Sequence, residues 1–179
     1  MSQLSLFDAR TGTLLNQTSE AVLITELLGY AGVLFRQWPT PVTLTAQSSA
    51  EQILQAYQPQ ITQLQQQEGY QTVDVISLHP DHPDKAALRQ KFLAEHTHSE
   101  DEVRFFVRGQ GLFCLHMQGK IYQVLCCQQD LIAVPAGTPH WFDMGSAPDF
   151  AAIRLFNNPS GWVANFTGSD IASRFPLLA

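Results

Sequence analysis

Cysteines and basic residues are both few in this chain of 179 residues, and each shortage excludes a class of protein. The three cysteines, Cys114 and the adjacent Cys126 and Cys127, fit neither a disulfide framework nor a Cys-x-x-Cys metal site. We expect them to be small buried side chains in a reducing, cytoplasmic compartment. The ten Lys and Arg residues are dispersed in a chain of net charge −6, which argues against nucleic acid as a partner.

Long apolar runs are also missing, so the sequence predicts no membrane-spanning segment. Residues 1–12 contain no basic segment followed by an apolar core, and we do not interpret them as a signal peptide. The content of 45% hydrophobic and 15% charged residues is that of an ordinary globular domain with one core. Because there is no repeat, long linker or heptad pattern, residues 1–179 are predicted to form a single, monomeric domain.

Short apolar segments separated by glycine-containing turns follow one another through residues 95–156. This spacing is typical of an antiparallel β-barrel or jelly roll, and it predicts a mainly β fold whose core strands carry the functional site. The expected strands are Val103–Val107, Leu112–Met117, Ile121–Cys127, Leu131–Val134, Trp141–Phe142 and Ala151–Phe156.

Residues 1–94 have a more mixed pattern and are predicted to pack on the barrel as a few helices and strands. Apolar residues at helical spacing predict helices over 22–28, 50–67 and 85–93, with Ser19 as a cap for the first. Apolar runs bounded by Gly, Pro or Asp predict strands over 4–7, 33–38 and 73–78.

Three histidines and one glutamate form the strongest functional pattern in the chain. On a strand, His96 and His98 point to the same face because side chains alternate with a period of two. Glu102 follows four residues after the second histidine, and His140 follows a turn rich in Pro and Gly. Such a set predicts a metal site. Four ligands leave two positions of an octahedron open, which favours catalytic Fe(II) or Ni(II) over four-coordinate zinc.

The same residues resemble the two motifs of the cupin superfamily. The first motif is met by His96, His98, Glu102 and Gly109, and the second by Pro135-x-Gly137-x-x-His140. Two positions that shape turns depart from the motifs, with Gln90 in place of Gly and Met144 in place of Asn. A longer resemblance, which covers nearly the whole chain, is to the acireductone dioxygenase family of methionine salvage. Its most specific segments are Phe92–Phe106, Gly111–Phe113, Val134–Ala136, His140–Gly145, Arg154–Phe156 and Gly161–Trp162.

The resemblance implies a cupin-type barrel that binds one metal ion per monomer and cleaves 1,2-dihydroxy-3-keto-5-methylthiopentene, an acireductone, with O2. In this family the ion decides the products. Fe(II) gives 4-methylthio-2-oxobutanoate and formate, whereas Ni(II) gives 3-methylthiopropionate, formate and carbon monoxide. The implied ligands in this chain are His96, His98, Glu102 and His140.

Arg104 is the candidate catalytic residue because it lies two positions after Glu102 and shares the ligand face of a continuing strand. A substrate dianion in a partly closed pocket needs such a counter-charge, and in the family this arginine is implicated in forming the dianion. The carboxylates Glu95 and Asp101 flank the ligands and are candidates for orienting the imidazoles or assisting metal entry.

An apolar thioether tail needs an apolar wall, which we expect aromatic residues near the ligands to supply. The candidate pocket residues are Phe92, Phe106, Phe142, Arg154 and Trp162. Two alternatives remain open at this stage: another mononuclear cupin enzyme acting on a different chelating substrate, and a cupin that binds small ligands without turnover.

Overall fold

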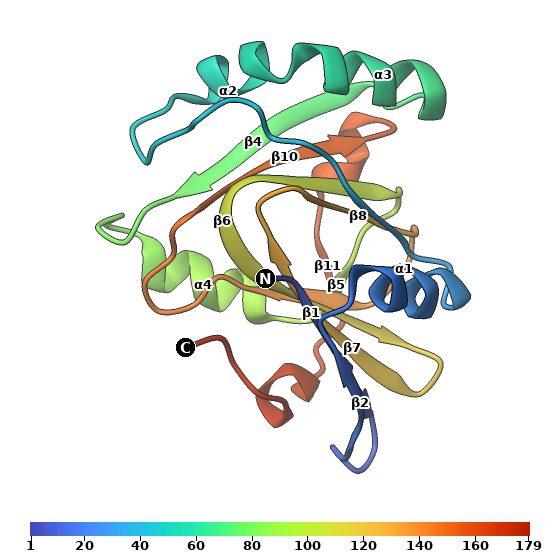
Figure 1. Cartoon of the computed structure of the whole chain (residues 1–179). Helices are drawn as coiled ribbons and strands as arrows, with labels where there is room; N and C mark the ends of the chain where they lie inside the picture. The colour runs from blue at the N-terminus through green and yellow to red at the C-terminus, as the bar shows by residue number, and fades with distance from the viewer.

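The computed structural model describes all 179 residues and is built on antiparallel strands, as predicted. One sheet has the order β11-β5-β9-β6-β7-β1-β2, and a second runs β3-β8-β6-β10-β4, so that β6 belongs to both (Figure 1). The strands are β1 Gln3–Asp8, β2 Leu14–Thr18, β3 Leu34–Gln37, β4 Thr72–Leu78, β5 His96–Thr97, β6 Glu102–Met117, β7 Lys120–Cys127, β8 Asp130–Val134, β9 His140–Asp143, β10 Phe150–Phe156 and β11 Asn165–Phe166.

Strand β6 is continuous over Glu102–Met117, whereas the sequence predicted two strands separated by a turn at Gly109 to Gly111. The glycines allow the strand to bend from one sheet into the other. Gly109 has φ +68°, and a Cβ at this position would lie 1.8 Å from the carbonyl oxygen of Asp149. The pairing of β6 with β10 shifts register nearby, between Ala151 and Ala152. The strand therefore bends at a glycine and a bulge, and the predicted turn does not form.

All four strands from residues 1–94 are hydrogen-bonded members of the sheets, and β2 pairs with β1 at the edge of the first sheet. β1 pairs with β7, β3 pairs with β8 and β4 pairs with β10. Strand β2 was not predicted, because its sequence Leu-Leu-Asn-Gln-Thr lacks alternation and its residues are largely exposed. The division of the chain into 1–94 and 95–156 stays a prediction.

The predicted helix over residues 50–67 is two helices, α2 Ala50–Ala56 and α3 Gln58–Glu68. Pro59 explains the break because it has no N–H to continue the helix and suits the first turn of a new one. The remaining helices are α1 Ala21–Tyr30, α4 Lys85–Leu93 and the 3₁₀ turns η1 Pro159–Trp162 and η2 Ile171–Arg174. Glu20 rather than Ser19 precedes α1, and no side chain caps it.

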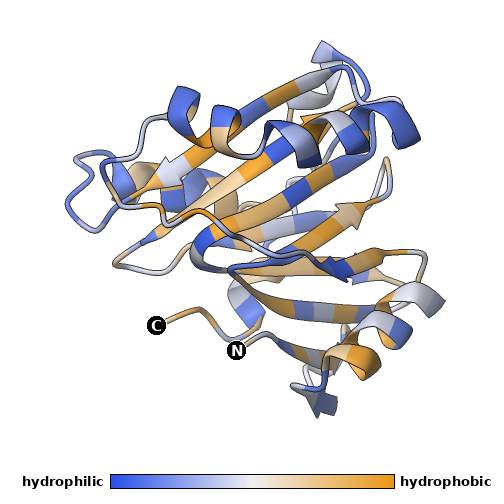
Figure 2. Cartoon of the chain, turned by 45° about the horizontal axis from the view of Figure 1, so that its top comes forward, coloured by the Kyte–Doolittle hydropathy of each residue, from blue (hydrophilic) through white to orange (hydrophobic).

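The hydrophobic core lies in three clusters around the sheets. The largest fills the barrel between β1, β6, β7, β9 and α1, and the second lies under α2 and α3. Figure 2 shows these two helices as largely hydrophilic above strands that are largely hydrophobic. The third cluster packs the C-terminal residues Ile171 and Phe175 against Trp141 on the outer side of β9. No helix is long and apolar enough to cross a membrane.

Candidate metal centre

Three buried histidines meet at one end of the barrel. His96 on β5 pairs in register with His140 on β9, and His98 follows directly after β5. The ring centroid of His96 lies 5.1 Å from that of His98 and 4.4 Å from that of His140. One nitrogen from each ring lies within 4.8 Å of the others, which fits a mononuclear metal centre.

Main-chain carbonyls orient all three rings. Because a carbonyl accepts hydrogen bonds only, each Nδ1 carries the proton and each Nε2 keeps its lone pair for a metal ion. The Nδ1–O pairs are His96 with Ala94 at 2.8 Å, His98 with Val163 at 2.9 Å and His140 with Thr138 at 2.8 Å.

Glu102 divides its carboxylate between the histidines and an arginine. Its Oε2 atom lies 3.3 Å from Nε2 of His98 and 3.5 Å from Nε2 of His140. Oε2 and the Nε2 of His140 are both buried without a hydrogen bond. Buried polar atoms are seldom left unpaired, and a divalent cation between these atoms would satisfy both. The residues therefore fit a metal ion.

The electrostatics of the centre favour the ligand forms of these side chains. Burial, followed by the charge of His140, lowers the pKa of His96 to about 4, and burial also lowers the pKa of His98. For Glu102, burial would raise the pKa, but Arg104 and the neighbouring histidines bring it well below its ordinary value. At neutral pH the centre thus offers the Glu102 carboxylate beside the neutral imidazoles of His96 and His98.

Arg104 on β6 is buried next to this carboxylate. It donates to Oε1 of Glu102 from Nε at 3.1 Å and from Nη2 at 2.6 Å. The guanidinium carbon lies 4.9 Å from the ring centre of Phe113 and 5.0 Å from that of Phe142. Its third nitrogen, Nη1, is buried without a partner. Glu102 therefore accepts from Nε and Nη2, while Nη1 is left to donate hydrogen bonds to a ligand.

A cavity of about 420 Å³ opens above the histidines. Of the predicted pocket residues, Phe92, Phe142, Arg154 and Trp162 line it, together with Arg104. Phe106 does not, because it lies deeper on β6 in the barrel core, 6.2 Å from the ring of Phe142. Four further lining residues were not predicted: Lys91, Val163, Ala164 and Phe166.

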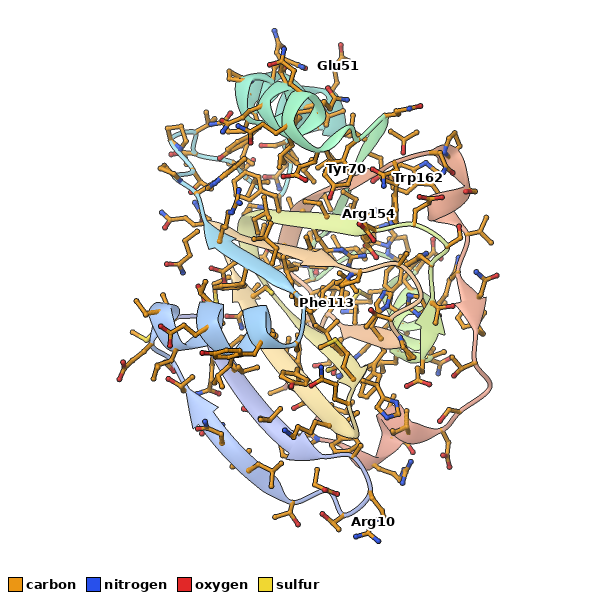
Figure 3. The ribbon with its side chains drawn as sticks, turned by 90° about the vertical axis from the view of Figure 1, so that its right-hand side faces the viewer. Arg10, Glu51, Tyr70, Phe113, Arg154 and Trp162 are labelled. Carbon is orange, nitrogen blue, oxygen red and sulfur yellow. The ribbon has the colours of Figure 1, made fainter.

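Arg154 lies at the side of this cavity, opposite Arg104 in the pairing of β10 with β6. It donates to Asp74 from Nε at 2.9 Å and from Nη2 at 2.6 Å, and its guanidinium carbon lies 5.0 Å from the ring centre of Trp162. Figure 3 shows Arg154 and Trp162 beside each other. Asp74 therefore balances the second arginine charge.

Glu95 and Asp101 have hydrogen-bond partners other than the three imidazoles, and the prediction that they orient these rings or assist metal entry stays a prediction. Glu95 accepts hydrogen bonds from Nδ1 of His116 at 3.1 Å and from the hydroxyl of Thr167 at 2.8 Å. Asp101 accepts from the main-chain N–H of Ala136 at 2.7 Å, in the turn that precedes His140. The carbonyls described above orient the rings, a function that the sequence pattern does not reveal.

Comparison with known proteins identifies the family. The model of the ARD/ARD' family matches residues 9–164. The acireductone dioxygenase of Alcanivorax borkumensis is 56% identical over 179 residues, which cover 99% of each chain. That of a Synechococcus species is 62% identical over 161 residues, covering 90% of this chain and 89% of the relative. The chain belongs to the acireductone dioxygenase family.

A solved structure of this family has the same fold. It is described as acireductone dioxygenase from Bacillus anthracis with cadmium ion in active center, and it matches with a TM-score of 0.82 at 28% identity. The match covers 93% of this chain and 98% of that one. The predicted mainly β, cupin-type barrel of the acireductone dioxygenase family is thereby confirmed.

Proposed function

We propose that this chain cleaves the acireductone 1,2-dihydroxy-3-keto-5-methylthiopentene with O2 in methionine salvage, using one Fe(II) or Ni(II) ion per monomer. The supporting observation is the meeting of three oriented imidazoles and one carboxylate below an open cavity, in a chain of the acireductone dioxygenase family. We further propose that the enzyme acts as a monomer in the cytoplasm. Fe(II) is expected to yield 4-methylthio-2-oxobutanoate and formate, and Ni(II) to yield 3-methylthiopropionate, formate and carbon monoxide.

Four side chains are proposed to hold the ion: His96, His98, His140 and Glu102. Their arrangement supports this assignment because Oε2 of Glu102 and the Nε2 atoms face one another at 3.3 and 3.5 Å. The bound ion would supply Lewis acidity toward an enediol and an attachment point for its two oxygens. The cavity lies on the side of the histidines from which a substrate can approach.

Arg104 is proposed to stabilise the deprotonated substrate. Arg104 lines the cavity and its Nη1 has no partner, while the two bonds to Glu102 fix the plane of the guanidinium. A fixed donor in a cavity poor in water stabilises a developing negative charge without the cost of reorganising. The substrate hydroxyl can therefore lose its proton more readily near this group.

The aromatic side of the cavity is proposed to hold the methylthio tail. Phe92, Phe142 and Trp162 line this side, and Arg154 packs on the ring of Trp162. An apolar wall excludes water from the tail and from the oxygens of the substrate. Arg154 is held by Asp74 and contributes mainly to the shape of the opening.

Oxygen uptake with the synthetic acireductone tests the proposal. Protein prepared without metal would be loaded with Fe(II) or with Ni(II), and the products would be identified by chromatography. We expect uptake with each ion and carbon monoxide with Ni(II) alone. Absence of uptake with both ions would contradict the dioxygenase function and favour a cupin that binds small ligands without turnover.

A further inference from the structure

One partly buried ion pair outside the metal centre, between a half-buried arginine and a buried aspartate, has no part in the function proposed above. Arg89 on α4 donates to the two carboxylate oxygens of Asp143, from Nε at 2.8 Å and from Nη2 at 3.0 Å. Asp143 is the last residue of β9, three positions after His140, and is 0% exposed. Removing the Asp143 carboxylate from water costs free energy, and this cost is offset only if further hydrogen bonds accompany the ion pair.

The C-terminal residues supply these further bonds. The main-chain N–H of Leu178 donates to Asp143 at 2.8 Å, and the carbonyl of Leu178 accepts from Arg89 at 3.0 Å. The N–H of Gly145 donates to Asp143 at 2.9 Å. We name the trio Arg89, Asp143 and Leu178 the C-terminal clamp. In Figure 1 the C-terminus accordingly ends close to α4.

Helix α4 has few other contacts to hold it. None of its residues is fully buried, and its apolar contacts come from three partly buried side chains, Leu88 and Phe92 against the barrel core and Leu93 against the third cluster. A short helix with so little buried surface depends on specific side-chain bonds for its position. Arg89 supplies such bonds.

The position of α4 matters for the active-site cavity. Phe92 lines the cavity and packs edge-on against Phe142 of β9, with ring centroids 6.4 Å apart. The chain then runs directly from α4 to Ala94, whose carbonyl orients His96. On β9, His140 and Phe142 face the cavity, whereas Asp143 faces the C-terminal residues. The two elements thus carry cavity groups on one side and the clamp on the other.

We propose that the C-terminal clamp is a positioning device that fixes α4 against β9 and so sets the spacing of the cavity wall between Phe92 and Phe142. Arg89, Asp143 and Leu178 act through the wall and do not touch the substrate. Loosening the clamp allows α4 to move away, which weakens substrate binding more than the chemical step. The kinetic part of this inference rests on the proposed function, whereas the mobility of α4 does not.

Three variants of the full chain test the clamp: Arg89→Met, Arg89→Lys and a chain ending at Pro176. Hydrogen–deuterium exchange of residues 85–94 and oxygen uptake in the Ni(II)-loaded protein would be measured. We expect α4 to exchange about tenfold faster and KM for the acireductone to rise about tenfold with kcat within about twofold. Arg89→Lys keeps the charge, which protects folding if Arg89→Met fails to fold, but it loses the bidentate geometry and should show the same direction.

Arg108→Met is the matched control. It breaks another arginine–aspartate pair, with Asp149, and the other hydrogen bonds of Arg108 go to the carbonyls of Leu78 and Phe150, so that none of its bonds involves α4. We expect this variant to change stability while α4 exchange and KM stay at the wild-type values. Wild-type exchange of α4 and wild-type KM in the folded Arg89 and truncated variants would overturn the proposal. An inactive wild-type protein would instead contradict the proposed function, and the exchange data would still decide on the clamp.

Discussion

At the scale of single residues, Glu102 lies between the histidines of the metal centre and Arg104. Its Oε1 accepts both bonds from Arg104, and its Oε2 faces the histidines. Removing one partner of a buried pair leaves an uncompensated charge, at a cost of about 3–5 kcal/mol. The arginine therefore contributes to stability as well as to the proposed reaction.

Arg104→Met tests both contributions. We expect metal content to remain near one ion per chain, because the four proposed ligands are retained. We also expect kcat to fall by about 10²-fold or more, since the donor for the substrate anion is lost. The metal-free variant should unfold at a lower urea concentration. Arg10→Met, an exposed change at the far end of the molecule in Figure 3, is the control and should match the wild type.

His140→Ala and His116→Ala separate ligating from structural histidines. His140 faces the metal centre, whereas His116 bonds Glu95 on the outside. We expect the first variant to lose bound metal and oxygen uptake together, as measured by elemental analysis and an oxygen electrode. The second should keep both. Full metal retention by His140→Ala would refute its assignment as a ligand.

At the scale of elements, the bend of β6 places the metal centre. The first half of the strand carries Glu102 and Arg104 and pairs with β8 and β10, and the second half pairs with β9, which carries His140. The two halves meet at Gly109. A strand without this bend would belong to one sheet only and would leave the ligands apart.

Gly109→Ala and Gly119→Ala form a matched pair for this bend. Both glycines have positive φ, so each alanine meets a backbone strain of about 1 kcal/mol. A Cβ at Gly119 meets no atom within 4 Å, whereas one at Gly109 collides with the main chain of Asp149. We therefore expect Gly109→Ala to lower the free energy of unfolding by roughly 3 kcal/mol or more, against about 1 for Gly119→Ala, in urea titrations. Equal losses would contradict this account.

The sequence predicted most elements because their apolar periodicity matches their burial. The prediction was wrong for α2 and α3, where Pro59 divides one helical pattern into two helices. It was also wrong for β6, where glycines bend a strand that they were expected to end. The three histidines were predicted to come together through local spacing and motif, and they do. The Arg89–Asp143 pair was missed because its partners are 54 positions apart and no local pattern joins them.

At the scale of the whole molecule, the hydrophobic clusters hold the barrel together without an ion. The proposed metal ligands lie at one end, and the clusters are built from apolar side chains that do not need an ion to pack. A chelator should therefore remove the metal and oxygen uptake while the far-ultraviolet circular dichroism stays native. Unfolding on chelation would indicate a structural ion instead.

Alkaline pH should weaken the folded state through Tyr70. Burial, followed by the charges of Asp101 and Glu68, raises the pKa of Tyr70 to about 12 from 10.0. The unfolded chain loses the Tyr70 proton at a lower pH than the folded chain does. The contribution of Tyr70 to the free energy of unfolding is therefore fully present below pH 10 and falls as the pH rises toward 12. Urea midpoints measured at pH 9, 10 and 11 should fall less steeply in Tyr70→Phe than in the wild type. The exposed control Tyr30→Phe should keep the wild-type slope.

The pairing of Arg104 with Glu102 has a consequence for electroneutrality at the metal centre. Because the guanidinium balances the charge of the carboxylate, a divalent ion held by the proposed ligands would keep its full double charge. A substrate that has lost two protons neutralises that charge. A substrate that has lost only one proton leaves a net positive charge in a medium of low permittivity, which is unfavourable. If the proposed ligands hold the ion, Arg104, which is not among them, would favour the doubly deprotonated form of the substrate.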